Sequence, residues 1–102
     1  MAYLYILYSK TIDQYYVGAT KELRVRVARH NAGHSLSTRR GIPWELKYCE
    51  MYSTKSEAMK REAEIKRMKS RQFVEELIKN ANDNKHEEWQ HNWRMWLSRF
   101  VE

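Results

Sequence analysis

Tyrosine is concentrated at the start of this 102-residue chain: five of its seven tyrosines occupy positions 3, 5, 8, 15 and 16. A buried strand needs aliphatic side chains, whereas each buried phenol carries a hydroxyl that needs a hydrogen-bond partner. Tyr5 and Tyr16 are eleven positions apart, so a hairpin between them would bring the two phenols together. Gly18 follows, where a missing Cβ allows close approach of a substrate backbone. Ordinary hairpin packing explains these residues as well as a reaction site does.

A basic pair follows on the next expected element, a helix. At about 100° per residue, Arg26 and His30 lie on one side of that helix, beside the apolar positions Leu23 and Val27. This placement at the edge of a core predicts that both side chains face the hairpin. Arg24 and Arg29 point elsewhere and are interpreted as part of a solvated face.

One carboxylate lies where a helix is otherwise apolar. Glu62 falls between Ala58 and Met59 on the helical wheel and one turn before Ile65, whereas Glu57 and Glu64 lie off that stripe. A carboxylate facing a core is costly unless it is paired or bound to a cation. An ion pair with Arg26 would explain Glu62 structurally, and a divalent metal ion would explain it functionally.

The elements that must position these residues alternate strands with helices. The patterns predict a hairpin of strands at 3–9 and 15–19 around a turn at 10–14, then a helix over 21–31 with Thr20 as its N-cap. After a basic loop come a strand at 44–52, a helix over 56–70 capped by Ser53 or Thr54, and a helix over 71–80. The order ββαβα plus helices predicts an α/β (α+β) fold with a three-stranded sheet and flanking helices.

Charge and composition narrow the partners. The formal net charge is +6, and residues 83–102 contribute −1, which leaves +7 on residues 1–82. Such a basic surface favours phosphate-bearing partners. No apolar run approaches the length of a membrane-spanning helix, and the N-terminus lacks the basic leader of a secretory signal, so no membrane partner is expected.

The metal-binding and nucleophilic motifs of other enzyme classes are missing. A single cysteine, Cys49, excludes an intramolecular disulfide and a cysteine-based zinc site. It lies in an apolar strand pattern and is interpreted as an inert core thiol, which favours a reducing, cytoplasmic location. The four histidines show no zinc-binding spacing, and the chain has no glycine-rich phosphate loop.

Together, Tyr-x-Tyr at 3–5 and Tyr-Val-Gly at 16–18 resemble the two motifs of the GIY-YIG nucleases, in particular the small single-domain bacterial members related to the nuclease domain of the excision-repair excinuclease. Arg26 falls ten residues after Tyr16, as the arginine of that family does, and Glu62 matches its metal-binding glutamate. The resemblance covers about residues 3–70 and implies a nuclease domain over 1–82. Tyr3 replaces the first glycine, and Ala19 stands where some members have lysine.

The resemblance implies a site and a reaction. A Mg²⁺ or Mn²⁺ ion held by Glu62 would support hydrolysis of phosphodiester bonds in DNA. Tyr5 is the expected activator of water, with Tyr16 orienting the water or sharing that role. Arg26 would stabilise charge on the phosphate, and His30 would contact phosphate or assist proton transfer. The expected contacts to the nucleic-acid backbone are Arg39, Arg40, Lys66 and Lys69.

Repair or recombination of structured DNA is the expected context, although RNA also fits the residues. The alternative is a nucleic-acid-binding module that is catalytically weak or silent. Against simple loss of activity, Tyr5, Tyr16, Arg26 and Glu62 are all present, and binding alone needs no core-facing carboxylate.

The C-terminal segment 83–102 is expected to form a further helix with one aromatic stripe. Its members are spaced by four, three and four residues and fall within a narrow arc: Trp89, Trp93, Trp96 and Phe100. A stripe of this size must dock somewhere. Docking on the same domain is favoured over a homodimer or stacking on unpaired bases. An interaction protein that uses this tail is a third functional possibility.

Overall fold

The computed structural model describes residues 1–83, and the expected aromatic helix and its homodimer contacts lie outside them. Three strands form one antiparallel sheet in the order β2-β1-β3, comprising β1 (Ala2–Ser9), β2 (Gln14–Thr20) and β3 (Trp44–Tyr52). The helices are α1 (Leu23–Asn31), α2 (Lys55–Met68) and α3 (Arg71–Asp83), with a short 3-10 turn η1 at Arg39–Gly41. This α+β architecture confirms the predicted fold class.

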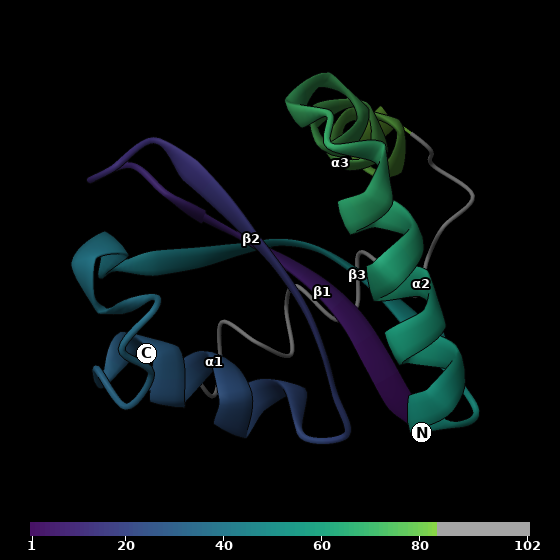
Figure 1. Cartoon of the computed structure of the whole chain (residues 1–102), viewed down its shortest axis with the longest axis horizontal. Helices are drawn as coiled ribbons and strands as arrows, with labels where there is room; N and C mark the ends of the chain where they lie inside the picture. Colours follow the sequence, from purple (N-terminus) through teal and green to yellow (C-terminus); the bar gives the residue numbers. More distant parts are fainter. Residues whose placement is uncertain (84–102) are drawn as a thin grey trace.

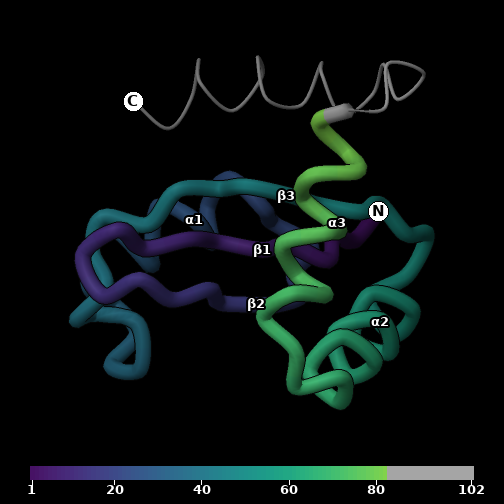
Figure 2. The backbone as a smooth tube through the Cα atoms, turned by 90° about the horizontal axis from the view of Figure 1, so that it is seen from above, coloured from purple at the N-terminus to yellow at the C-terminus, as the bar shows by residue number. Residues whose placement is uncertain are grey.

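Helices cover both faces of the sheet (Figure 1). Helix α1 lies on one face, and α2 and α3 lie on the other; seen from above, β1 runs between β2 and β3 (Figure 2). Because β1 is central and covered on both sides, its side chains are buried in both directions, which explains its nearly continuous run of large apolar and aromatic residues.

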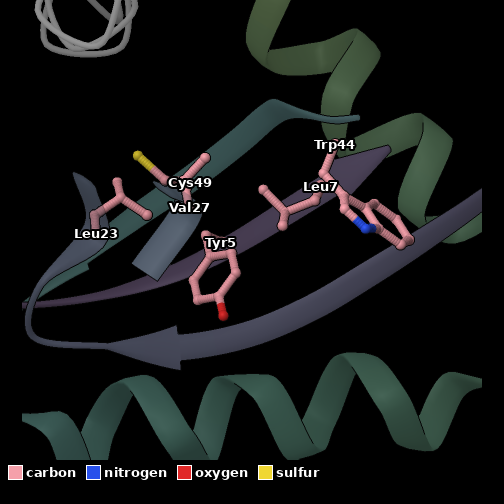
Figure 3. Close-up of a cluster of buried hydrophobic side chains, with 6 residues drawn as sticks. All are labelled: Tyr5, Leu7, Leu23, Val27, Trp44 and Cys49. Atoms are coloured by element: carbon pink, nitrogen blue, oxygen red, sulfur yellow. The ribbon is translucent and has the colours of Figure 1, made fainter. Parts of the chain in front are cut away.

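Alternation along β1 divides the core in two. Tyr5 and Leu7 face α1, and this cluster includes Leu23, Val27, Trp44 and Cys49 (Figure 3). Leu4 and Ile6 face the other way, together with Val17, Tyr48, Ile65 and Val74. Cys49 is fully buried and burial raises its thiol pKa, so the structure agrees with the interpretation of an inert core thiol.

The hairpin has the register that the tyrosine spacing requires. Tyr5 pairs with Gly18 and Leu7 pairs with Tyr16, so both phenols project from the same face of the sheet. On the other side of β1, Ile6 pairs with Tyr48 and Leu7 with Leu46, which leaves an irregularity in β3.

The cap predictions differ in outcome. Thr54 and Glu57 form a capping box at the start of α2, where the Thr54 hydroxyl accepts from the Glu57 amide (3.2 Å) and the Glu57 carboxylate accepts from the Thr54 amide (3.1 Å). Thr20 was the wrong residue for the α1 cap. It ends β2, and its hydroxyl accepts from the Glu22 amide (3.0 Å), so the helix begins only at Leu23.

The loop between α1 and β3 is held by side chains. The Asn31 amide donates to the Trp44 carbonyl (3.0 Å), and the Trp44 amide donates back to Asn31 Oδ1 (2.6 Å). The Trp44 indole donates to the Thr38 carbonyl (2.7 Å). These contacts fix the path of residues 31–44 beside the C-terminal end of α1.

Candidate active site

The structure brings four of the expected site residues together on the α1 face of the sheet. The ring centroids of Tyr5 and Tyr16 lie 6.2 Å apart, and that of His30 lies 4.8 Å from Tyr16. The hydroxyl of Tyr5 is 3.0 Å from His30 Nε2. Arg26, one helical turn before His30, makes side-chain hydrogen bonds with both Tyr5 and Tyr16. The predicted juxtaposition of hairpin and helix therefore holds.

The two phenols differ in access to solvent. The Tyr5 side chain is 1% exposed, and Tyr16 is half-buried. Burial raises the pKa of Tyr5 to about 12; the hydrogen bond from Arg26 opposes this shift, and the charge of Glu62 adds a smaller increment in the same direction as burial. Tyr5 therefore stays a neutral phenol across the physiological range.

His30 is buried between two hydroxyl groups. Besides the Tyr5 contact at Nε2, its Nδ1 atom lies 2.9 Å from Thr38 Oγ1. Burial, followed by the nearby Arg26 charge, lowers the pKa of His30 to about 4, so the ring is neutral at pH 7.

One proton arrangement satisfies this whole chain of contacts. The Thr38 hydroxyl also lies 3.5 Å from the Ser35 carbonyl, to which it donates. The His30 Nδ1–H then donates to Thr38, and the Nε2 lone pair accepts from the Tyr5 hydroxyl. Thr38 is thus a member of the site that the sequence reasoning missed. It lies in an irregular loop, where no periodicity indicates which way a threonine faces.

Gly18 has a different function from the one expected. A Cβ at this position would lie 2.5 Å from the Tyr5 hydroxyl oxygen and 2.6 Å from Tyr5 Cζ. The tyrosine ring therefore fills the space above the glycine, with its hydroxyl pointing toward β2 (Figure 3). Gly18 admits the Tyr5 side chain, and the expectation that it lets a substrate backbone approach is corrected.

Glu62 lies on α2, a helix of the other sheet face, and its side chain is 23% exposed. Its carboxylate accepts from Lys66 Nζ at 2.5 Å, one helical turn away. The alternative of an ion pair with Arg26 is therefore not realised, because Arg26 bonds the two tyrosines. The charge of Glu62 nevertheless acts on Tyr5.

The expected nucleic-acid contacts fall on two separate surfaces. Arg39 and Arg40 are exposed on η1, where Arg39 donates through Nε and Nη2 to the Gly33 carbonyl (3.1 and 3.0 Å). Lys66 and Lys69 line a cavity of about 290 Å³ at the end of α2. Lys69 ends that helix in the left-handed conformation, with φ 48°. The structure does not bring these two pairs together.

A further polar cluster on the α2 side was not foreseen. Glu50 accepts from Arg61 through both carboxylate oxygens (3.0 and 3.2 Å) and from the hydroxyls of Tyr48 and Tyr52. These bonds join β3 to α2 at the residue before Glu62. They outweigh the burial of Glu50, so the pKa of its carboxyl is lowered.

Comparison with known proteins identifies the family of this domain. The model of the GIY-YIG catalytic domain matches residues 1–82. The chain belongs to the GIY-YIG family. This is a nuclease family, and the cluster of Tyr5, Tyr16 and Arg26 lies in its catalytic domain.

Individual GIY-YIG relatives are named UPF0213 proteins. One from Streptococcus pneumoniae serotype 4 is 37% identical over 93 residues, which cover 90% of this chain and 93% of the relative. Others are from Staphylococcus saprophyticus, 43% identical over 74% of this chain and 92% of the relative, and Staphylococcus haemolyticus, 46% identical over 63% and 78%. No solved structure matches the chain.

Within residues 1–83, no helix is long and apolar enough to cross a membrane. The same part of the chain has no cluster of three or more histidine, cysteine or acidic side chains placed to hold a metal ion.

Proposed function

We propose that this GIY-YIG domain is a divalent-metal-dependent endonuclease that hydrolyses phosphodiester bonds in structured DNA during repair or recombination. The observation that carries the proposal is the hydrogen-bonded group of Tyr5, Tyr16, Arg26 and His30, with the charge of Glu62 acting on it. Packing alone does not require a guanidinium that interacts with two phenols.

The different solvent exposure of Tyr5 and Tyr16 suggests a different role for each phenol. A base must reach the water from which it takes a proton. Tyr5 is buried and hydrogen-bonded to His30, so Tyr16 is the better candidate for the contact with water. The role of Tyr5 is then to hold the buried side of the site in place next to Tyr16. A phenol has an ordinary pKa near 10, so a neighbouring guanidinium is needed to favour the phenolate that accepts the proton. Arg26 is the guanidinium that interacts with both phenols.

Arg26 has a second task in this scheme. Hydrolysis builds negative charge on the phosphate oxygens, and a preorganised guanidinium stabilises that charge. Arg26 is exposed although it bonds the tyrosines, so a phosphate can approach it from solvent. His30 is buried and neutral, which makes it a hydrogen-bond partner for Tyr5 and no direct cationic contact for phosphate.

Glu62 suits a metal ion that the protein holds through a single carboxylate. Mg²⁺ and Mn²⁺ prefer oxygen ligands, and Mg²⁺ is commonly held by one or two carboxylates together with water and substrate phosphate. Glu62 supplies one such carboxylate, half-buried and electrostatically linked to the tyrosine site. When bound, the ion would supply Lewis acidity and stabilise the leaving oxygen. Lys66 must release Glu62 for this to happen.

That same ion pair is the observation that favours a second candidate function. With Lys66 neutralising Glu62, the domain is arranged as a nucleic-acid-binding module with weak or silent catalysis. Both candidates bind DNA through a domain that carries +7 over residues 1–82, with Arg39, Arg40, Lys66 and Lys69 as backbone contacts.

A panel of branched, flapped, nicked and linear DNAs, and one single-stranded RNA, separates the two candidates. Each is incubated with the full chain in Mg²⁺, in Mn²⁺ or in chelator. Metal-dependent cleavage of one structured DNA supports the nuclease, whereas binding without cleavage of any member supports the silent module.

A further inference from the structure

A cavity of about 340 Å³ opens beside the proposed active site at the C-terminal end of α1. It is lined by Arg26, Arg29, His30, His34 and Ser35. All five are basic or polar, and no acidic side chain of the described residues lines it. Its chemistry is that of an anion-binding site.

Two of these residues have no task in the site described above. Arg29 and His34 are exposed, and within residues 1–83 neither side chain has a hydrogen-bond or ion-pair partner. Arg26 and His30, in contrast, are already bonded to the tyrosines. The cavity therefore has donors that remain available to a ligand.

The backbone that carries these donors is fixed in place. The His34 amide donates to the Arg29 carbonyl (3.1 Å), which closes the loop onto the end of α1. Arg39 holds the intervening Gly33 carbonyl with two nitrogen atoms. A fixed loop reduces the ordering cost of binding.

The position of the cavity indicates which anion it takes. Arg26 and Arg29 are three residues apart on one helix and line the same cavity. The expectation that Arg29 points away from Arg26 is therefore corrected. If Arg26 contacts the phosphate that is cleaved, Arg29 at the same cavity can contact a neighbouring phosphate of the strand. The C-terminal end of a helix does not attract anions by its dipole, so binding here must come from the side chains.

We propose that Arg29 and His34, with the Ser35 hydroxyl, form a subsite for the phosphate group adjacent to the cleaved linkage. The inference rests on the proposed function, because Arg26 defines where the cleaved phosphate lies. The ligand is a phosphate of the nucleic-acid strand, either an internal linkage or the phosphate at a strand end.

Binding to a flap DNA in chelator tests the subsite without requiring cleavage. Copies of the DNA each carry one uncharged methylphosphonate at a single linkage around the branch, and a further pair differs by a 5′-phosphate or a 5′-hydroxyl at the branch. If the subsite makes one charge-assisted contact, the parent protein should bind about tenfold more weakly to the DNA in which that one linkage is a methylphosphonate. Arg29→Ala should bind the unmodified DNA about tenfold more weakly than the parent does. Its affinity should not change further when that linkage is replaced by a methylphosphonate.

Matched variants separate a local contact from net charge. Lys79→Ala removes the same charge from α3, on the opposite face of the sheet, and should keep the full sensitivity of the parent. Arg29→Lys should recover part of the affinity. If a methylphosphonate at an internal linkage weakens binding, the subsite holds an internal phosphate. If only loss of the 5′-phosphate weakens binding, the subsite holds the phosphate at a strand end.

If Arg29→Ala keeps the parent's sensitivity at every linkage and to the 5′-phosphate, the subsite is wrong. This result is distinct from failure of the nuclease proposal. If the protein cleaves DNA but no single linkage affects binding, only the subsite proposal is rejected. If one linkage affects binding but the protein cleaves no DNA in the presence of metal, only the nuclease proposal is rejected.

Discussion

The Nε2 atom of His30 lies 3.0 Å from the hydroxyl oxygen of Tyr5, and both side chains are 1% exposed. This contact joins α1 to the central strand β1 at the proposed catalytic centre. Because Thr38 bonds the other ring nitrogen, the imidazole has a partner on each side. Fixing Tyr5 in this way also fixes the surface against which Tyr16 packs.

The first prediction concerns stability and pH. The pKa of His30 is lowered from 6.5 in the unfolded chain to about 4 in the folded one. Between pH 6.5 and pH 4, His30 is protonated in the unfolded chain but neutral in the folded chain. The free energy of unfolding therefore falls as the pH falls toward 4, by up to about 1.4 kcal/mol per pH unit. Urea unfolding at pH 7.5 and 5.5 should show this loss.

A pair of histidine variants isolates the cause of that loss. His30→Gln should remove most of the dependence between pH 7.5 and 5.5, whereas His34→Gln, at an exposed site, should keep it. An unchanged dependence in His30→Gln would mean that another group carries the titration.

The second prediction separates the two phenols. Tyr5→Phe leaves the buried His30 Nε2 without a donor, so it should cost about 1–3 kcal/mol of stability. Tyr16→Phe removes the more exposed hydroxyl and should lower the cleavage rate by at least about a hundredfold with a smaller effect on stability. Single-turnover cleavage and urea unfolding measure the two effects, and a Tyr16→Phe variant as active as the parent would exclude Tyr16 as the base.

The third prediction concerns Gly18. Gly18→Ala places a methyl group within 2.6 Å of two atoms of Tyr5, so the ring must move. Overpacking of this kind should destabilise the domain by about 1–3 kcal/mol. In the background of Tyr5→Leu the same substitution should cost much less. Equal costs in both backgrounds would show that the ring is not what excludes a side chain at this position.

The fourth prediction concerns the ion pair on α2. Lys66→Met removes the cation that neutralises Glu62 and should lower the metal concentration needed for half-maximal cleavage several-fold. Lys60→Met, an exposed lysine on the same helix, should leave it unchanged. A rise in the metal requirement for Lys66→Met would show that the lysine assists the metal site.

Much of the fold follows from short-range patterns in the sequence. The strand at Trp44–Tyr52 was predicted at the observed residues, and Thr54 is one of the two residues predicted to cap α2, since alternation and capping are local properties. Thr20 shows the limit of this reasoning. Its type suits a helix cap, but strand pairing with Tyr3 keeps it in β2.

The site was predictable where helical or hairpin spacing determines a side chain's direction. Tyr5, Tyr16, Arg26 and His30 follow from such spacing. The Thr38 contact and the Lys66–Glu62 pair do not, because each depends on how a loop closes or on which of several nearby cations reaches a carboxylate. Gly18 was recognised, but the residue that fills its empty side was not.

The fifth prediction tests the central claim most directly. Glu62→Gln keeps the size of the side chain and removes the charge that a metal ion requires. Single-turnover cleavage of the preferred branched DNA in Mg²⁺, measured beside binding to the same DNA in chelator, should show cleavage reduced by at least about a hundredfold with binding within a few-fold of the parent. A Glu62→Gln variant that cleaves as fast as the parent would contradict the assignment of Glu62 to a metal ion.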